Sequence, residues 1–324
     1  MRIFKPKSNR MILVGVWANR NWILGNWIKE VQLRHPNNFK LWWVPSIYAG
    51  KRKFEKFISF PIPNAEAYFF SYPTIFNFYF KKNPKKFLNN SLILYPHNEP
   101  EMGSIYEQVD LLNQAYKVYF YCKQDAENLV SNGFKKEKVV IANCAIDNDC
   151  VTSKKEVREQ RTIVLASKFG PRKGAELLPS IVNNLPDWNF IIMGRGWDNF
   201  LRQEKLLSLP NLTYVQFNKK NRAKYFSKAK IFLSLSNLEG GPVPLIESMA
   251  LGVIPISTST GFAPEFIHDG SNGYLIPINT DPNFVVSKIT SIDKLNERPE
   301  LSVSHLTWDR IARLTYSDLH NITN

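Results

Sequence analysis

Short apolar runs that alternate with amphipathic segments constrain the fold of this chain more than any other feature. Six such runs occur before residue 153 and six after residue 160, with a polar, charged stretch of linker composition between them. Strands that alternate with helices predict a parallel sheet covered by helices on both faces. The expected strands span residues 11–17, 39–44, 67–71, 91–96, 117–122 and 138–143, and then 162–167, 189–194, 212–217, 230–236, 253–258 and 273–278.

The two sets of runs predict two Rossmann-like, doubly wound α/β domains, at residues 1–152 and 153–303. Residues 304–324 carry apolar side chains at helical spacing behind a Ser or Thr cap, so we expect a helix that packs back on the first domain. Ligands of open α/β sheets bind beyond the carboxyl ends of the strands. We therefore expect the domains to face each other across a cleft lined by strand-to-helix loops. Helices are expected at 101–115, 123–131, 173–184, 198–208, 222–229, 244–250 and 263–268.

Length and composition place the chain among ordinary globular proteins. Its 324 residues are 44% hydrophobic and 22% charged, which excludes disordered and fibrous classes. The three cysteines, Cys122, Cys144 and Cys150, lack the spacing of a zinc site or a disulfide scaffold and indicate a reducing compartment. The most apolar window, 67–80, is interrupted by polar residues and is too short for a membrane span, and no signal peptide is visible. We expect a cytoplasmic protein.

Positive charge is concentrated in the first third of the chain. The net charge is +14, and residues 1–100 hold 16 Lys and Arg against 4 Asp and Glu, a net of +12. Such a surface attracts anionic lipid or nucleic acid, but it is also compatible with a solvated face over core aromatics. Both interpretations stay open. The basic clusters are Lys51, Arg52, Lys53 and Lys56, then Lys81, Lys82, Lys85 and Lys86, beside Phe54, Phe57, Phe78, Tyr79 and Phe80.

The segment SNLEGGPVPLIESMALG, residues 236–252, follows an expected strand and enters an expected helix. The backbone N–H groups of Gly240, Gly241 and Val243 would lie at the helix N-terminus, where the dipole and the free donors favour a phosphate. Pro244 suits the first helical turn because its missing donor is harmless there. The loop is therefore predicted to bind an anion.

Two carboxylates, Glu239 and Glu247, flank this predicted anion site. Carboxylates accept hydrogen bonds from hydroxyl groups, so a phosphate with sugar hydroxyls beside it, a sugar nucleotide, fits the segment. The alternative is structural, with Glu239 capping the helix and Glu247 exposed on it. The neighbouring loops favour the first interpretation.

The block KIFLSLSNLEGGPVPLIESMALGVIPISTSTGFAPEFIHDGSNGYLIP resembles the retaining glycosyltransferases of family 4, the glycosyl transferases group 1 type. Their signature is a pair of glutamates with seven residues between them, as at Glu239 and Glu247. The resemblance covers roughly residues 160–320 and is weak before them. It implies the GT-B fold and a metal-independent transfer of a hexose from a nucleoside-diphosphate sugar. The order of later matches is Thr260-Gly261, Pro264-Glu265 and Asp269-Gly270-Ser271-Asn272-Gly273.

The same resemblance assigns cations to the loop after the first strand of the second domain. Lys168 and Lys173, which precedes Gly174, match the residues that bind the diphosphate, and they would stabilise the charge that develops on it as it leaves. The family usually has arginine where Lys168 stands, and Arg172 is a substitute for its bidentate fork. The alternative is that these are surface cations near a helix start.

Further donor contacts follow from the resemblance. Gly194-Arg195-Gly196, after the second strand, matches the family's glycine pair. Glu247 is implied to bind the ribose hydroxyls of the nucleotide. Glu239 and the amides of Gly240 and Gly241 are implied to bind the donor sugar.

The first domain is expected to supply the acceptor side and a donor-contacting histidine. His97, in YPHNEP at the end of an expected strand, is the candidate, although a lone histidine is often structural. Glu99 is a weaker candidate. Asn19 and Arg20, in the loop after the first strand, are expected to approach the phosphate, although the family's glycine pair is absent there.

The resemblance leads us to expect that the chain transfers a hexose from a UDP- or GDP-sugar to a hydroxyl acceptor. A lipid-linked acceptor at the inner face of an anionic membrane agrees with the basic, aromatic first domain, and no cofactor or metal is expected. One rival is a non-catalytic protein of the same fold that binds anionic membrane or nucleic acid. A second rival is an epimerase or dehydrogenase, but no GxGxxG follows a strand with an acid at the required distance.

Overall fold

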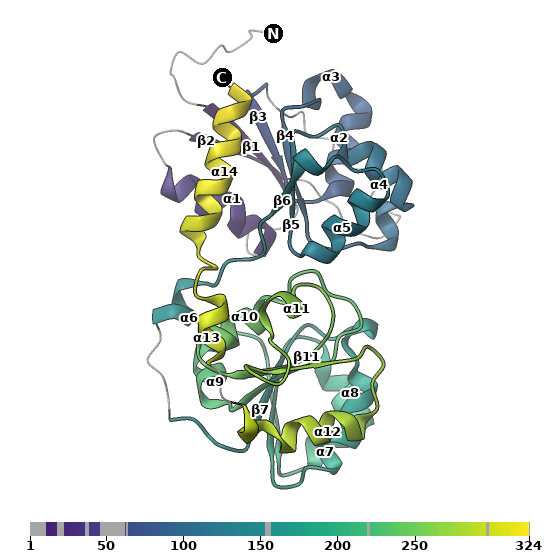
Figure 1. Cartoon of the computed structure of the whole chain (residues 1–324), viewed down its shortest axis with the longest axis vertical. Helices are drawn as coiled ribbons and strands as arrows, with labels where there is room; N and C mark the ends of the chain where they lie inside the picture. Colours follow the sequence, from purple (N-terminus) through teal and green to yellow (C-terminus); the bar gives the residue numbers. More distant parts are fainter. Residues whose placement is uncertain are drawn as a thin grey trace. The chain divides into compact units, whose positions relative to one another are not determined.

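The computed structural model describes residues 11–17, 23–35, 39–45, 62, 64–152, 157–218, 221–295 and 298–323. The chain divides into two compact units. The first unit contains residues 1–143 and 308–324, and the second contains residues 144–307. Each unit is a parallel sheet with helices on both sides (Figure 1). The expected α/β architecture with two parallel-sheet domains is thus confirmed.

In the described part of the first unit, six parallel strands pair in the order β2-β1-β3-β4-β5-β6. The residues of β3 and β4 are all buried, as expected for short apolar runs covered on both faces. The strands are β1 (Met11–Trp17), β2 (Phe39–Pro45), β3 (Ala67–Phe70), β4 (Ser91–Tyr95), β5 (Lys117–Phe120) and β6 (Val139–Ile141).

Helices cover the two faces of this sheet. One face carries α1 and α14, which lie side by side, and the other carries α2 to α5 (Figure 1). Helix α4 starts at a capping box in which Ser104 and Glu107 bond each other's backbone N–H groups. The helices are α1 (Ile23–Arg34), α2 (Pro73–Lys82), α3 (Pro84–Phe87), α4 (Ile105–Leu112), α5 (Lys123–Ser131) and α14 (Trp308–Thr323).

In the described part of the second unit, six parallel strands pair in the order β12-β11-β10-β7-β8-β9. Helices α7, α8 and α12 cover one face, and α9, α10 and α13 the other (Figure 1). The strands are β7 (Thr162–Ala166), β8 (Asn189–Met193), β9 (Leu212–Val215), β10 (Ile231–Ser234), β11 (Ile254–Thr258) and β12 (Tyr274–Ile276). The helices are α6 (Asn148–Thr152), α7 (Leu178–Asn183), α8 (Trp197–Gln203), α9 (Arg222–Lys228), α10 (Val243–Ala250), α11 (Ala263–Phe266), α12 (Pro282–Thr290) and α13 (Pro299–Val303).

Several element bounds differ from the expectations; for example, the helices expected at 101–115 and 198–208 span only Ile105–Leu112 and Trp197–Gln203. Residues 144–152 belong to the second unit, although the first domain was expected to run to residue 152, because α6 packs on α10. The helix expected at 173–184 begins only at Leu178, because Gly174 adopts a left-handed conformation that separates a 3₁₀ turn, Pro171–Lys173, from the rest. No helix in the described ranges is long and apolar enough to span a bilayer.

Candidate functional site

Four loops, which follow strands β7, β8, β10 and β11, lie at the carboxyl edge of the second sheet. Backbone hydrogen bonds join them across long sequence separations. Asn237 N–H donates to the carbonyl of Arg172 (2.8 Å), and Phe262 N–H donates to the carbonyl of Gly240 (2.9 Å). Since ligands of open α/β sheets bind at this edge, the loops form the candidate site.

Lys173 and Glu239 form an ion pair between two of these loops. The Lys173 Nζ contacts Glu239 Oε1, and the side chains are only 13% and 11% exposed. Glu239 N–H donates to Thr260 Oγ1 (3.1 Å), and Arg172 Nη1 donates to the carbonyl of Leu238 (3.2 Å). A cation and an acid predicted from separate motifs are thus neighbours.

Two glycines allow the loops to approach each other. Gly174 has φ +62°, and a Cβ there would lie 2.2 Å from the carbonyl oxygen of Leu235. Gly194 has φ +151°, and a Cβ there would lie 1.7 Å from the carbonyl oxygen of Ser167. A side chain at either position would separate the strands' loops, so both glycines act through packing.

The N-terminus of α10 lies in the loop that follows β10, where an anion site was predicted. The N–H groups of Gly240, Gly241 and Val243 form no hydrogen bond with the backbone acceptors of other described residues. Pro244 lies in the first turn, as expected. The free amides and the helix dipole favour a phosphate at this position.

Glu247 has a different partner from Glu239. It is 3% exposed, and its Oε1 lies 2.8 Å from Nη2 of Arg222, which also contacts Asp147 and Asp149. Burial alone lowers the pKa of Arg222, but the field of Glu247 and the bond to Asp147 raise it overall. The sequence analysis missed Arg222. A usable signal was its helical spacing from Phe226, which is buried.

The other cations predicted for the donor site, Lys168, Arg172 and Arg195, are more exposed than Arg222. Lys168 and Arg195 are exposed on the loops that follow β7 and β8, while Arg172 is half-buried. The Phe169 N–H, next to Lys168, donates to the carbonyl of Arg195 (2.9 Å), so the two loops run together. Asn19 and Arg20 lie outside the described residues, as does the cluster Lys51, Arg52, Lys53 and Lys56 with Phe54 and Phe57.

The first unit has its own polar cluster at the carboxyl edge of its sheet. His97 Nε2 lies 3.0 Å from Glu99 Oε1, and the Tyr72 hydroxyl donates to Glu99 Oε2 (2.6 Å). Burial, followed by the bond to Glu99, raises the pKa of Tyr72, and burial also raises the pKa of Asp125, close to His97. The weaker candidate, Glu99, is therefore the partner of His97. Tyr72 and Asp125 carried no motif by which the sequence could single them out.

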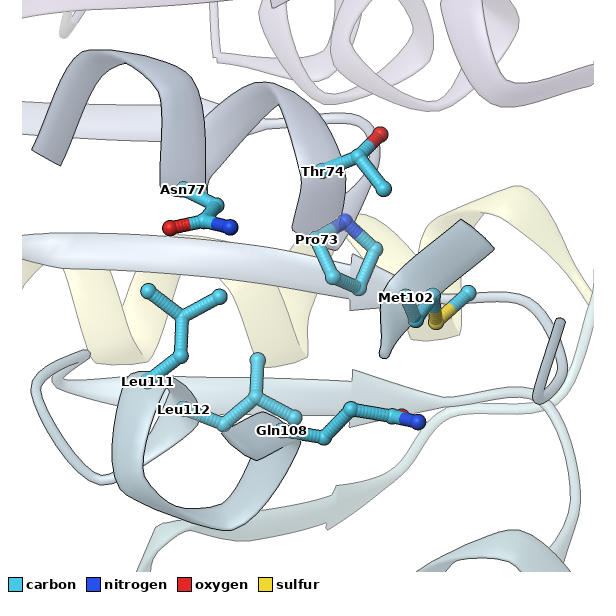
Figure 2. A pocket seen from close by; sticks show the side chains of 7 residues that line it. All are labelled: Pro73, Thr74, Asn77, Met102, Gln108, Leu111 and Leu112. Atoms are coloured by element: carbon cyan, nitrogen blue, oxygen red, sulfur yellow. The ribbon is translucent and has the colours of Figure 1, made fainter. Parts of the chain in front are cut away.

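Neither of two cavities in the described residues coincides with the candidate site. Figure 2 shows a cavity of about 10 Å³ in the first unit, between α2 and α4, which admits at most a water molecule. A hollow of about 420 Å³ in the second unit includes residues that precede β7 and β8, at the opposite edge from the loops. The lining of the small cavity is Pro73, Thr74, Asn77, Met102, Gln108, Leu111 and Leu112.

The loops of the candidate site lie in a segment that is similar to a known protein family. Residues 151–301 match the family profile "Glycosyl transferases group 1". The matched segment covers most of the second unit. The group 1 match contains the Lys173–Glu239 pair, Gly194, the start of α10 and Glu247.

Curated relatives share part of the length of this chain. The UDP-N-acetylglucosamine--peptide N-acetylglucosaminyltransferase GtfA subunit of Streptococcus pneumoniae is 27% identical over 139 residues, 41% of this chain and 28% of that protein. The putative colanic acid biosynthesis glycosyltransferase WcaL of Salmonella typhimurium is 23% identical over 238 residues, 67% of this chain and 56% of that protein. The matches thus cover between about a quarter and just over half of these two proteins.

Solved structures resemble this chain over almost its whole length. Anabaena Alr3699/HepE in complex with UDP-glucose superposes with a TM-score of 0.75 at 14% identity, covering 96% of this chain and 100% of that one. Sucrose-phosphate synthase from Thermosynechococcus elongatus gives 0.73 at 15% identity, covering 96% and 98%. The chain therefore has the GT-B fold of these structures.

Proposed function

We propose that this protein is a retaining, metal-independent glycosyltransferase that moves a hexose from a nucleoside-diphosphate sugar to a hydroxyl acceptor. The observation that carries the proposal is the Lys173–Glu239 pair beside the N-terminus of α10, inside the group 1 match. UDP-sugar is the favoured donor class, with GDP-sugar as the alternative, because Alr3699/HepE was solved with UDP-glucose.

In this proposal, the diphosphate lies between Lys173 and the free N–H groups of Gly240, Gly241 and Val243. These groups stabilise the charge that develops on the diphosphate as the bond to the anomeric carbon breaks. The acceptor oxygen bonds to that carbon on the same face, and its proton passes to the departing phosphate. Configuration is thereby retained without an enzymatic nucleophile.

The other site residues bind the two ends of the donor. Glu239 accepts hydrogen bonds from the sugar hydroxyls, and Glu247 accepts them from the ribose. Lys168, Arg172 and Arg195 add positive charge, and Gly194 lets the loop approach the nucleotide. These cations supply the charge neutralisation that a divalent metal gives other transferases, so we expect turnover to survive chelation by EDTA.

The first unit is proposed to bind the acceptor. We propose that His97, which contacts Glu99 through Nε2, contacts the donor sugar when the donor binds. The exposed lysines of α2 and α3 lie beside Phe78, which is 41% exposed, and Lys82 Nζ lies 4.1 Å from its ring. We therefore propose a lipid-linked acceptor reached from the cytoplasmic face of an anionic membrane.

A panel of UDP- and GDP-sugars, assayed for hydrolysis and thermal stabilisation, tests the proposal. At least one donor should be hydrolysed slowly, and Lys173→Met should lower that rate on the order of 100-fold, the loss typical of a missing oxyanion donor. Lys224→Met, an exposed lysine of α9, is the matched control. If no donor binds, or if Lys173→Met turns over like the wild type, the proposal is wrong.

A further inference from the structure

Arg222 is an arginine buried among three carboxylates from two other segments of the chain. It is 5% exposed at the start of α9. Its Nη2 lies 2.7 Å from Asp147 Oδ2, 3.1 Å from Asp149 Oδ1 and 2.8 Å from Glu247 Oε1. A buried guanidinium requires such partners, since burying it alone would cost several kcal/mol. In the proposed donor site, Glu247 binds the ribose, whereas Asp147 and Asp149 have no role.

All three carboxylates contact the same nitrogen of Arg222, Nη2. A guanidinium Nη2 carries two hydrogens, and these donate to Asp147 and Asp149. Glu247 Oε1 makes a third contact with the same nitrogen, at 2.8 Å. Nε of Arg222 is buried and has no hydrogen-bond partner among the described residues. Arg222 therefore places its positive charge next to the Glu247 carboxylate, at Oε1.

Glu247 needs this cation because it is 3% exposed. A buried carboxylate without a counter-charge takes up a proton, and a protonated carboxyl is a poorer acceptor for two hydroxyl groups. Arg222 of α9 and Cys150 of α6 both lie close to Glu247. Burial and the charge of Glu247 raise the pKa of the Cys150 thiol to about 12, so the thiol adds no second negative charge beside Arg222.

We propose that Arg222 is a positioning residue that holds Glu247 ionised and oriented for the vicinal hydroxyl groups of the donor's ribose. The inference rests on the proposed function, in which Glu247 binds the ribose. Asp147 and Asp149 hold Arg222 in place through its two donated hydrogen bonds, so Arg222 does not follow Glu247 when a ligand binds.

Calorimetric titration with UDP, 2′-deoxy-UDP, GDP and 2′-deoxy-GDP tests the proposal. The wild type should bind the ribonucleotide about tenfold more tightly than its deoxy form, the value of one charge-assisted hydrogen bond. Glu247→Gln and Arg222→Met should each reduce this preference below about twofold, and the double variant should equal either single one. Arg222→Lys should keep an intermediate preference, and Lys224→Met on the same helix should keep all of it.

In steady state, Arg222→Lys should raise KM for the donor by a larger factor than it lowers kcat. Thermal unfolding reports whether each variant is folded. If Arg222→Met does not fold, Arg222→Lys and Glu247→Gln replace it in the test. Arg222→Lys keeps a cation among the three carboxylates, and Glu247→Gln keeps Arg222 with Asp147 and Asp149. An undiminished preference in folded Arg222 variants overturns this inference, as does a wild type that binds both nucleotides equally. A wild type that binds no nucleotide at all overturns the proposed function instead.

Discussion

Glu239 and Lys173 neutralise each other in the ligand-free protein. A diphosphate that binds Lys173 must therefore compete with the Glu239 carboxylate. The two side chains are only 11% and 13% exposed, so solvent screens this competition weakly. The two residues should consequently respond differently to substitution.

Glu239→Gln should raise the affinity for UDP about threefold, because a competing charge is removed at a part-buried site. The same change should lower turnover of the UDP-sugar at least about tenfold, because the sugar loses an ionised acceptor. Calorimetry with UDP and a hydrolysis assay measure the two effects. Weaker binding of UDP together with unchanged turnover would contradict the assignment.

Gly194 illustrates a residue whose role is conformational. Its φ is +151°, and an added Cβ would lie 1.7 Å from the Ser167 carbonyl oxygen. Gly194→Ala should lower the free energy of unfolding of the second unit by about 3 kcal/mol. Gly170→Ala is the matched control, since its backbone is extended and a Cβ there meets nothing within 4 Å. Chemical denaturation measures both, and equal stabilities would show that the loop yields without cost.

At the scale of elements, α14 completes the first unit although it lies at the far end of the chain. Its Thr315 accepts a hydrogen bond from the indole Nε1 of Trp27 in α1 (3.2 Å), and Trp27 is 1% exposed. Arg310 donates to the carbonyls of Ile141 and Ala142, just where β6 ends. Helix α14 is therefore tied both to α1 and to the last strand of the sheet.

Thr315→Val keeps the shape of the side chain but leaves the buried indole N–H without its acceptor. This should destabilise the first unit by about 1–2 kcal/mol. Ser317→Ala, at an exposed position of the same helix, should change stability by less than about 0.5 kcal/mol. Denaturation followed by tryptophan fluorescence compares the two, and equal effects would mean that the indole bond contributes nothing.

At the scale of the whole molecule, positive charge is distributed unevenly along the chain. The first 100 residues carry a net charge of +12 out of +14. In the described residues, Lys81, Lys82 and Lys85 are exposed on α2 and α3. The long-range field of the protein is therefore strongly polarised toward its first unit.

Sedimentation with phosphatidylglycerol vesicles should show binding that is lost in high salt and absent with phosphatidylcholine. The pair Lys81→Glu and Lys85→Glu should weaken binding more than about tenfold, since each lysine contributes about 1 kcal/mol. Lys135→Glu with Lys136→Glu, exposed in the same unit, makes the same change in net charge as a control. Vesicle binding that does not weaken in high salt, or an equal loss of binding in the two double variants, would refute a lipid-binding surface on α2 and α3.

The sequence by itself determined the strand order along the chain, the parallel-sheet class and the loops that carry the site. Those features follow from local periodicity and from short motifs, which neighbouring residues define. Even so, α7 was predicted to start too early, because the left-handed Gly174 depends on the approach of the β10 loop.

Only the tertiary structure decided which side chains meet. The contact of Lys173 with Glu239, of Glu247 with Arg222, and of Trp27 with Thr315 each joins segments brought together by strand pairing or helix packing. No local pattern reports such partners, because crossovers place residues side by side regardless of their separation in the chain. For the same reason the spacing of Arg222 from Phe226 indicated only that it lies on the inner face of a helix, and its carboxylate partners became known only when α6, α9 and α10 were packed together.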